Sequence, residues 1–200
     1  MESKEISMQM QMTYAELISY LKQKYGVAPF DYFRNPSFKS KNPKVSRGSE
    51  GLACHHIDED KAIMISSPKQ APKYPFEWQK ADRLVYCNYM EHLILHIKIA
   101  EEPRHPDAMP HQLPGIGGAV NFIIPEMNDY FNGYKFSKKW MLAAFELIKD
   151  NYEDYLNVLK YLWRLINKDE RYTGRYSIEK MSMGWQMKPY KNILKELSNV

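Results

Sequence analysis

The sequence predicts an α+β fold in one mainly helical domain. Apolar residues repeat every three or four positions in segments 14–25, 89–100 and 137–166, which is the spacing of helices that bury one face. Segments 51–54 and 83–87 are short and apolar, and the second contains the β-branched and aromatic residues that favour strands. A chain of 200 residues is long enough for one well-buried core, so we expect one domain.

Two of the expected helices begin at a capping-box motif. Thr13 is followed three residues later by Glu16, and the apolar repeat then continues to Gly26, a plausible stop. Asn88 and Glu91 have the same spacing at the start of the next helix. The sequence therefore predicts a strand that leads directly into a capped helix.

The remaining segments predict a mixture of loops and helices. Residues 61–65 are expected to form a brief strand, and the prolines of 67–75 predict a loop. The glycine-rich segment GIGG at 115–118 lacks the preceding strand and following Lys-Ser or Lys-Thr of a phosphate-binding loop, so it predicts a flexible turn. Residues 137–166 predict one long helix or two stacked ones, and a short helix is expected after Pro189.

The composition indicates a cytoplasmic protein that does not enter a membrane. No stretch approaches the roughly 18 apolar residues of a membrane span, and the N-terminus lacks the apolar core of a signal peptide. Two cysteines, Cys54 and Cys87, cannot build a disulfide framework, which favours a reducing compartment.

Basic residues gather in two segments that could contact a polyanion. Between residues 34 and 47 there is no acidic residue, and the cations are Arg34, Lys39, Lys41, Lys44 and Arg47. The segment that starts at Arg171 and includes Arg175 mixes cations with aromatic residues. A solvated basic surface remains an equally good reading of either segment alone.

Four of the six histidines lie in two short stretches, CHHIDED and EHLILH. His92 and His96 are four positions apart on an expected helix, so their rings share one face. His55 and His56 end the first expected strand and could supply a third ligand. This pattern indicates a divalent-metal site rather than scattered polar residues.

The order of these motifs resembles the HNH endonucleases, also called His-Me finger or ββα-metal nucleases. The resemblance covers about residues 51–99: His55-His56-Ile57, then Leu84-Val85-Tyr86-Cys87 and Asn88, then the segment from Glu91 to His96. It implies a central ββα-metal finger at 51–100 within the mainly helical domain. Residues 1–50 would add a helix and the basic loop, and 101–200 a helical region packed on the finger.

The resemblance also implies the chemistry of a phosphodiester hydrolase. His55, His92 and His96 would hold one divalent ion, Mg²⁺, Mn²⁺, Ni²⁺ or Zn²⁺, and His56 would be the general base that activates water. The expected substrate is DNA, with RNA left open, in a bacterial or phage-encoded protein of the cytoplasm. A single metal site cuts one strand, so cutting both requires a homodimer or two visits.

One position departs from the family pattern. Where these nucleases carry the asparagine that braces the loop between the strands, this chain has Arg83, preceded by Asp82. Asp82 could make the bracing bonds, or Arg83 could act in catalysis by contacting the scissile phosphate. Glu91 is expected to cap its helix, with a supporting role beside the metal ligands also open.

Two other functions fit parts of the same pattern. Cys54 and Cys87 together with His92 and His96 could form a structural zinc site of a nucleic-acid-binding or protein-binding module, but this leaves His55 and His56 unexplained. A nuclease-like scaffold that has lost its activity is the other alternative. The acidic residues 58–60 are expected to form a solvated turn, and a role as extra metal ligands is the less favoured alternative.

Overall fold

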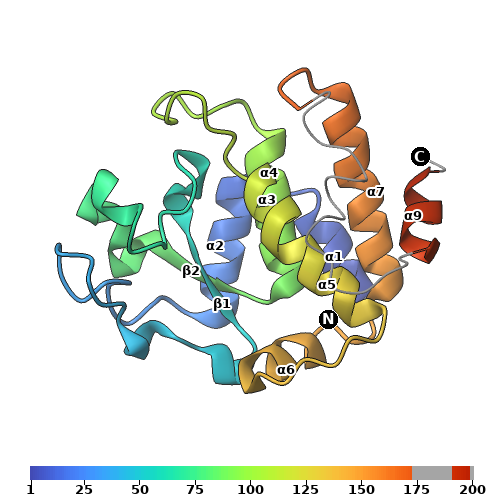
Figure 1. Cartoon of the computed structure of the whole chain (residues 1–200), viewed down its shortest axis with the longest axis horizontal. Coiled ribbons are helices and arrows are strands. Elements are labelled where there is room, and N and C mark those ends of the chain that lie inside the picture. The colour runs from blue at the N-terminus through green and yellow to red at the C-terminus, as the bar shows by residue number, and fades with distance from the viewer. Residues whose placement is uncertain (173–190, 199–200) are drawn as a thin grey trace.

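The sheet of the protein has two antiparallel strands, β1 (Ala53–His56) and β2 (Leu84–Cys87). The structure is a computed structural model of the chain, and it describes residues 1–172 and 191–198 (Figure 1). The register pairs His55 with Val85 and His56 with Leu84. All of β2 is buried, in agreement with its apolar sequence.

Helix α3 (Tyr89–Glu101) follows β2 directly and runs through the centre of the molecule (Figure 1). Its capping box is formed as predicted: the Asn88 side chain accepts from the Glu91 backbone N–H at 2.9 Å, and the Glu91 carboxylate accepts from the Asn88 N–H at 2.8 Å. Nearly every residue of α3 is buried, as expected of a helix with neighbours on all sides.

Helix α2 (Tyr14–Tyr25) packs on both β2 and α3. Its predicted capping box between Thr13 and Glu16 is also confirmed, and it ends at Gly26, whose φ of 80° favours glycine. A short helix α1 (Ser3–Gln9), which was not expected, precedes it and lies against α3.

The C-terminal half supplies further helices. A column of α4 (Ile116–Gly118), a π-helical turn (Ala119–Ile123) and α5 (Ile124–Phe131) covers α3 (Figure 1). The predicted turn at 115–118 is therefore wrong, because Gly115 starts this column. Residues 137–166 form two helices, and the helix predicted after Pro189 is confirmed; these elements are α6 (Lys139–Glu146), α7 (Tyr152–Lys168) and α9 (Lys191–Ser198).

Short 3₁₀ turns replace regular structure in most of the segment from residue 28 to 83. They are Pro43–Val45, Gly48–Glu50, Ile57–Asp60, Ala71–Lys73, Phe76–Gln79 and Ala81–Arg83. The brief strand expected at 61–65 does not form. Met64 has a φ of 60°, and its carbonyl accepts from the Ser67 N–H at 2.9 Å, so the chain turns there instead of extending.

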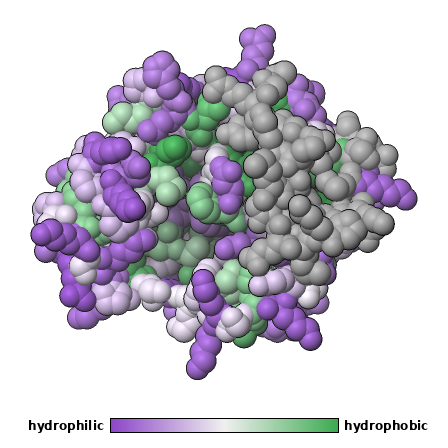
Figure 2. Space-filling model, viewed as in Figure 1, coloured by the Kyte–Doolittle hydropathy of each residue, from purple (hydrophilic) through white to green (hydrophobic). Residues whose placement is uncertain are grey.

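One main core joins the three regions expected from the sequence. Its buried side chains come from α1, α2, β2 and α3 and also from α4 to α7 and α9. The α+β class is thus confirmed. None of the described helices is both long and apolar enough to cross a membrane. In the space-filling view, the face toward the viewer is hollowed between the 28–83 segment at the left and the α4–α5 column (Figure 2).

Candidate metal centre

Three histidines from two elements converge beside the sheet. His55 lies on β1, and His92 and His96 lie one turn apart on α3. One ring nitrogen of each histidine lies within 4.8 Å of those of the other two. His55 and His96 are buried and His92 is half-buried. Within the described part of the chain, this is the one group of histidine, cysteine and carboxylate side chains that could hold a metal ion.

A short chain of hydrogen bonds sets the tautomer of His55. Tyr14 donates its single hydroxyl proton to the carbonyl of Ile57 at 2.8 Å. In the 2.9 Å contact between Tyr14 Oη and His55 Nε2, the histidine must therefore be the donor. With the proton on Nε2, the lone pair is on Nδ1, and no described residue bonds to that buried atom. His55 can thus bind a metal through Nδ1.

His96 is held by the 115–118 segment. Its Nδ1 lies 2.8 Å from the Gly115 carbonyl, which can only accept, so the free lone pair is on Nε2. Gly115 has a φ of 81°, and Gly118 packs against the ring. A Cβ at Gly118 would lie 2.3 Å from His96 Cε1. The glycines are therefore a close-fitting support for this histidine.

His56 makes a different set of contacts because successive residues of a strand point to opposite faces. Its Nε2 lies 2.9 Å from Gln79 Oε1, and the Gln79 amide nitrogen donates to the Ile65 carbonyl at 3.1 Å. That second bond requires His56 to donate from Nε2, which leaves a lone pair on Nδ1. Tyr32 packs on the ring at 4.4 Å between centroids. No described residue bonds to Nδ1 of His56.

Burial keeps these imidazoles neutral at neutral pH. It holds the pKa of His55 and of His92 well below the ordinary range, and nearby imidazoles add to the effect. It lowers the pKa of His96 and of His56 to about 4, although a hydrogen bond to each ring acts in the other direction. A neutral imidazole is the form that binds a metal or accepts a proton.

Glu59 faces the histidines, so the expected solvated turn at 58–60 is wrong. Its Oε2 lies 3.5 Å from His96 Nε2 and 3.7 Å from His55 Nδ1, and its Oε1 lies 3.9 Å from His56 Nδ1. Burial raises the pKa of this carboxyl to about 8. The turn Ile57–Asp60 directs the side chain inward because it immediately follows β1.

Arg83, the residue that departs from the family pattern, braces the same turn. Its guanidinium donates to both carboxylate oxygens of Asp58, at 2.8 and 2.6 Å. Lys61 also donates to Asp58, at 2.8 Å. Burial would raise the pKa of Asp58, but these cations lower it below the ordinary value. The ion pair ties the start of β2 to the turn after β1.

The other two residues considered for supporting roles lie elsewhere. Asp82 is exposed, and its backbone carbonyl accepts from Lys22 Nζ at 2.6 Å. Glu91 is buried in its capping box and pairs with Lys24 at 2.7 Å. The Lys22 contact ties α2 to the turn before β2, and the Glu91 contacts stabilise the N-terminal end of α3. None of these contacts involves the three histidines.

The basic segment before β1 is partly engaged in local contacts. Lys41 donates to the Tyr32 hydroxyl at 2.9 Å, and Lys44 lies over the ring of Phe30. Arg47 pairs with Glu50. The exposed cations of this segment are Arg34, Lys39, Lys41 and Lys44.

At the other basic segment, Arg171 is held by internal partners. It pairs with Asp169 at 2.6 Å and donates to the carbonyls of Ala100 and Glu102. These bonds fasten the end of α3 to the segment after α7. Arg175 lies outside the described residues.

Neither cysteine takes part in the metal group. Cys87 is buried, with its Sγ 4.0 Å from the Ala53 carbonyl. Burial raises the pKa of the Cys54 thiol to about 12, so this thiol is protonated in the metal-free protein. The structure therefore does not bring the two cysteines together with His92 and His96 in one group of possible metal ligands.

Five supporting residues were not predicted from the sequence, and they are Tyr14, Tyr32, Gln79, Gly115 and Gly118. Each is remote in sequence from the histidine that it contacts, and local patterns carry no signal for such pairs. Glu59 had a signal, because it lies three and four residues after His56 and His55.

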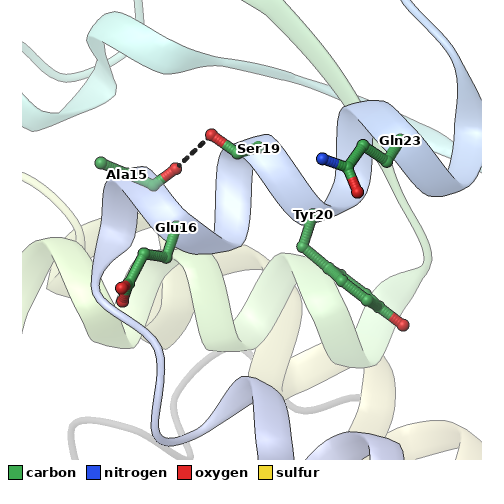
Figure 3. A pocket seen from close by; sticks show the side chains of 5 residues that line it. All are labelled: Ala15, Glu16, Ser19, Tyr20 and Gln23. Carbon is green, nitrogen blue, oxygen red and sulfur yellow. Dashed lines mark hydrogen bonds between the residues drawn. The ribbon is translucent and has the colours of Figure 1, made fainter.

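A separate depression lies on the outer face of α2 (Figure 3). It is lined by Ala15, Glu16, Ser19, Tyr20 and Gln23, which all belong to this one helix. Ser19 donates to the Ala15 carbonyl at 3.0 Å. The depression is an open helix surface that contains none of the histidines, so we assign it no chemistry.

Comparisons of the chain with protein-family models, with curated proteins and with solved structures gave no significant match.

Proposed function

We propose that the protein is a metal-dependent endonuclease of the HNH, or ββα-metal, type that hydrolyses phosphodiester bonds in DNA. The observation that carries this proposal is the separation of roles between adjacent histidines. His55 joins His92 and His96 in a group that could hold a metal ion. His56 keeps a lone pair on Nδ1 and takes no part in that group.

In this proposal the ligand atoms are His55 Nδ1, His96 Nε2 and one nitrogen of His92. Three imidazoles favour Zn²⁺ or Ni²⁺ over Mg²⁺, which prefers oxygen ligands. When bound, the ion would act as a Lewis acid that stabilises charge on the phosphate oxygens. Tyr14 and Gly115 keep the two ring protons on the far side of their histidines.

His56 is the proposed general base. Its Nδ1 would accept a proton from the attacking water, and Gln79 holds the opposite nitrogen protonated. The hydrogen bond from His56 Nε2 to Gln79 Oε1 becomes stronger when the His56 ring gains this proton and its positive charge. Tyr32 packs on the ring and limits its rotation.

Cations of the 34–47 segment are the proposed DNA contacts. Lys41 lies next to this site, since its Nζ donates to the hydroxyl of Tyr32, the residue that packs on His56. Arg34 and Lys39 are exposed and available for backbone phosphates. Arg171 would have to break its bonds to Asp169, Ala100 and Glu102 to reach DNA, so we assign it a structural role and not a DNA contact.

The proposal is tested by cleavage of supercoiled plasmid with purified wild type, His56→Ala and His111→Ala. His111 is an exposed histidine outside the site and serves as the matched control. We expect metal-dependent cleavage by wild type and His111→Ala, and loss of cleavage in His56→Ala with metal content retained. Bound metal without cleavage in wild type under Zn²⁺, Ni²⁺, Mn²⁺ or Mg²⁺ would instead indicate a metal-binding scaffold.

A further inference from the structure

Glu59 occupies the space between the metal-binding histidines and His56. Its two carboxylate oxygens divide between the two sides, Oε2 near His55 and His96 and Oε1 near His56. The side chain is only 18% exposed. All three separations, 3.5 to 3.9 Å, are too long for good hydrogen bonds. No hydrogen bond from a described residue ends on this carboxylate, so both of its oxygens keep their lone pairs for another partner.

The same separations suit ligands that share one ion. Bonds of about 2.0 to 2.1 Å at tetrahedral angles place two ligand atoms about 3.4 Å apart. Oε2 lies 3.5 Å from His96 Nε2 and 3.7 Å from His55 Nδ1, within a few tenths of an ångström of that value. An ion bound to both nitrogens would therefore also reach Glu59.

We propose that Glu59 is the fourth ligand of the metal and that the substrate phosphate must displace it. This inference rests on the proposed function. A closed set of four ligands leaves no position for substrate, whereas catalytic sites keep one open. Oε1 stands 3.9 Å from His56 Nδ1, in the space that the attacking water needs. One phosphodiester anion replaces one carboxylate anion, so the charge around the ion is unchanged.

The position of Glu59 on the chain permits this exchange. It lies in a single 3₁₀ turn after β1, and its neighbour Asp58 is anchored by Arg83 and Lys61. The backbone of the turn can therefore stay in place while the Glu59 side chain rotates about its own bonds.

The test measures metal binding directly, with Co²⁺ as a spectroscopic substitute for Zn²⁺. Metal-free wild type, Glu59→Ala, Glu59→Gln and Asp60→Asn are titrated with Co²⁺, and inorganic phosphate is then added to each loaded protein. Asp60 is adjacent to Glu59 in the chain, but its carboxylate lies 4.0 Å from His105, which is outside the proposed metal site. The Asp60→Asn variant therefore controls for the loss of one negative charge near the site.

We expect Glu59→Ala to bind Co²⁺ at least about tenfold more weakly and with an altered visible spectrum. We expect the loaded Glu59→Ala to take up phosphate at lower concentration than wild type, because no carboxylate competes. Asp60→Asn should match wild type in Co²⁺ affinity, in visible spectrum and in phosphate affinity. Far-UV circular dichroism of the metal-free proteins checks folding, and Glu59→Gln provides a second variant of nearly the same size.

Unchanged Co²⁺ affinity and spectrum in both Glu59 variants would overturn the ligand assignment. Equal phosphate affinity in wild type and Glu59→Ala would overturn the displacement. Absence of Co²⁺ binding in wild type would overturn the metal centre itself. If the protein binds Co²⁺ as expected of a four-ligand site but cuts no DNA, the nuclease proposal fails while the assignment of Glu59 as a ligand stands.

Discussion

His96 lies so close to Gly118 that a single added carbon would collide with its ring, 2.3 Å from Cε1. A contact below about 3 Å requires one of the two groups to move. Gly118 is in helix α4, where alanine is otherwise favoured over glycine. Residue 118 must therefore be glycine if the His96 ring is to keep its position as a proposed metal ligand.

Gly118→Ala should therefore weaken metal binding by at least about tenfold, because the displaced ring cannot keep Nε2 aimed at the ion. Calorimetric titration with Zn²⁺ measures the effect. Gly117→Ala is the matched control, since its added Cβ would meet its nearest atom, Asn121 Nδ2, at 3.8 Å. Equal affinities in the two variants would show that His96 is not a ligand.

Tyr14→Phe should lower metal affinity about 10- to 100-fold, because His55 loses the group that accepts its Nε2 proton. Tyr20→Phe, on the same helix, removes a hydroxyl that donates to Glu5 and should leave affinity unchanged. Zn²⁺ titration of both variants provides the comparison. A Tyr14→Phe protein with wild-type affinity would argue against binding through His55 Nδ1.

Gln79→Glu should move the acidic limit of DNA cleavage to higher pH. Burial lowers the pKa of His56 to about 4, so the neutral ring persists through most of the acidic range. A carboxylate at Gln79 would favour the protonated ring and raise this pKa. Activity requires the neutral form and is lost as pH falls through the pKa. Rate profiles, with metal content checked at each pH, measure the shift; identical profiles would exclude His56 as the base.

Arg83→Met should destabilise the protein by about 2 kcal/mol, because the buried Asp58 carboxylate loses two hydrogen bonds from a charged donor. Urea unfolding measures this change, with the exposed Arg34→Met as control. A loss of cleavage with unchanged stability would be the opposite result. It would mean that Arg83 acts on the scissile phosphate and not as a brace.

The metal-free protein should lose stability as pH falls from about 6.5 to about 4. Unfolded histidines titrate near pH 6.5, whereas His56 and His96 have a folded pKa of about 4. Within this window the unfolded chain binds more protons, so the free energy of unfolding decreases toward acid, by about 3 kcal/mol for each histidine. Urea unfolding in EDTA across the window tests this, and His56→Gln should show a shallower decrease.

Local signals in the sequence were enough for much of the fold. The capping boxes at Thr13 and Asn88 located the starts of α2 and α3, and the spacing of His92 and His96 placed both on one helix face. These features depend on residues within one helical turn of each other. The helix α1 has no such signal, because its N-cap residue Glu2 makes no side-chain capping bond.

The supports of the metal centre could not be predicted in this way. His96 and Gly115 are 19 positions apart, His56 and Gln79 are 23 apart, and Tyr14 and His55 are 41 apart. Which of these pairs meet depends on how α2, the turn Phe76–Gln79 and the α4–α5 column pack around β1 and α3. The GIGG segment shows the consequence: its composition indicates a turn, whereas close contacts with His96 explain Gly115 and Gly118.

The irregular connection from Ile57 to Arg83 has a consequence for the lifetime of the protein. An ion held by His55 and His92 would join the two ends of this connection in the folded chain only, so its binding free energy would add to the free energy of unfolding. Parts of the connection, including Ile63 and Met64, are exposed in the folded chain, but loss of the ion would raise the population of unfolded chain that proteases cleave throughout. The supply of metal in the cell would in this way set how long the polypeptide survives as well as whether it can react.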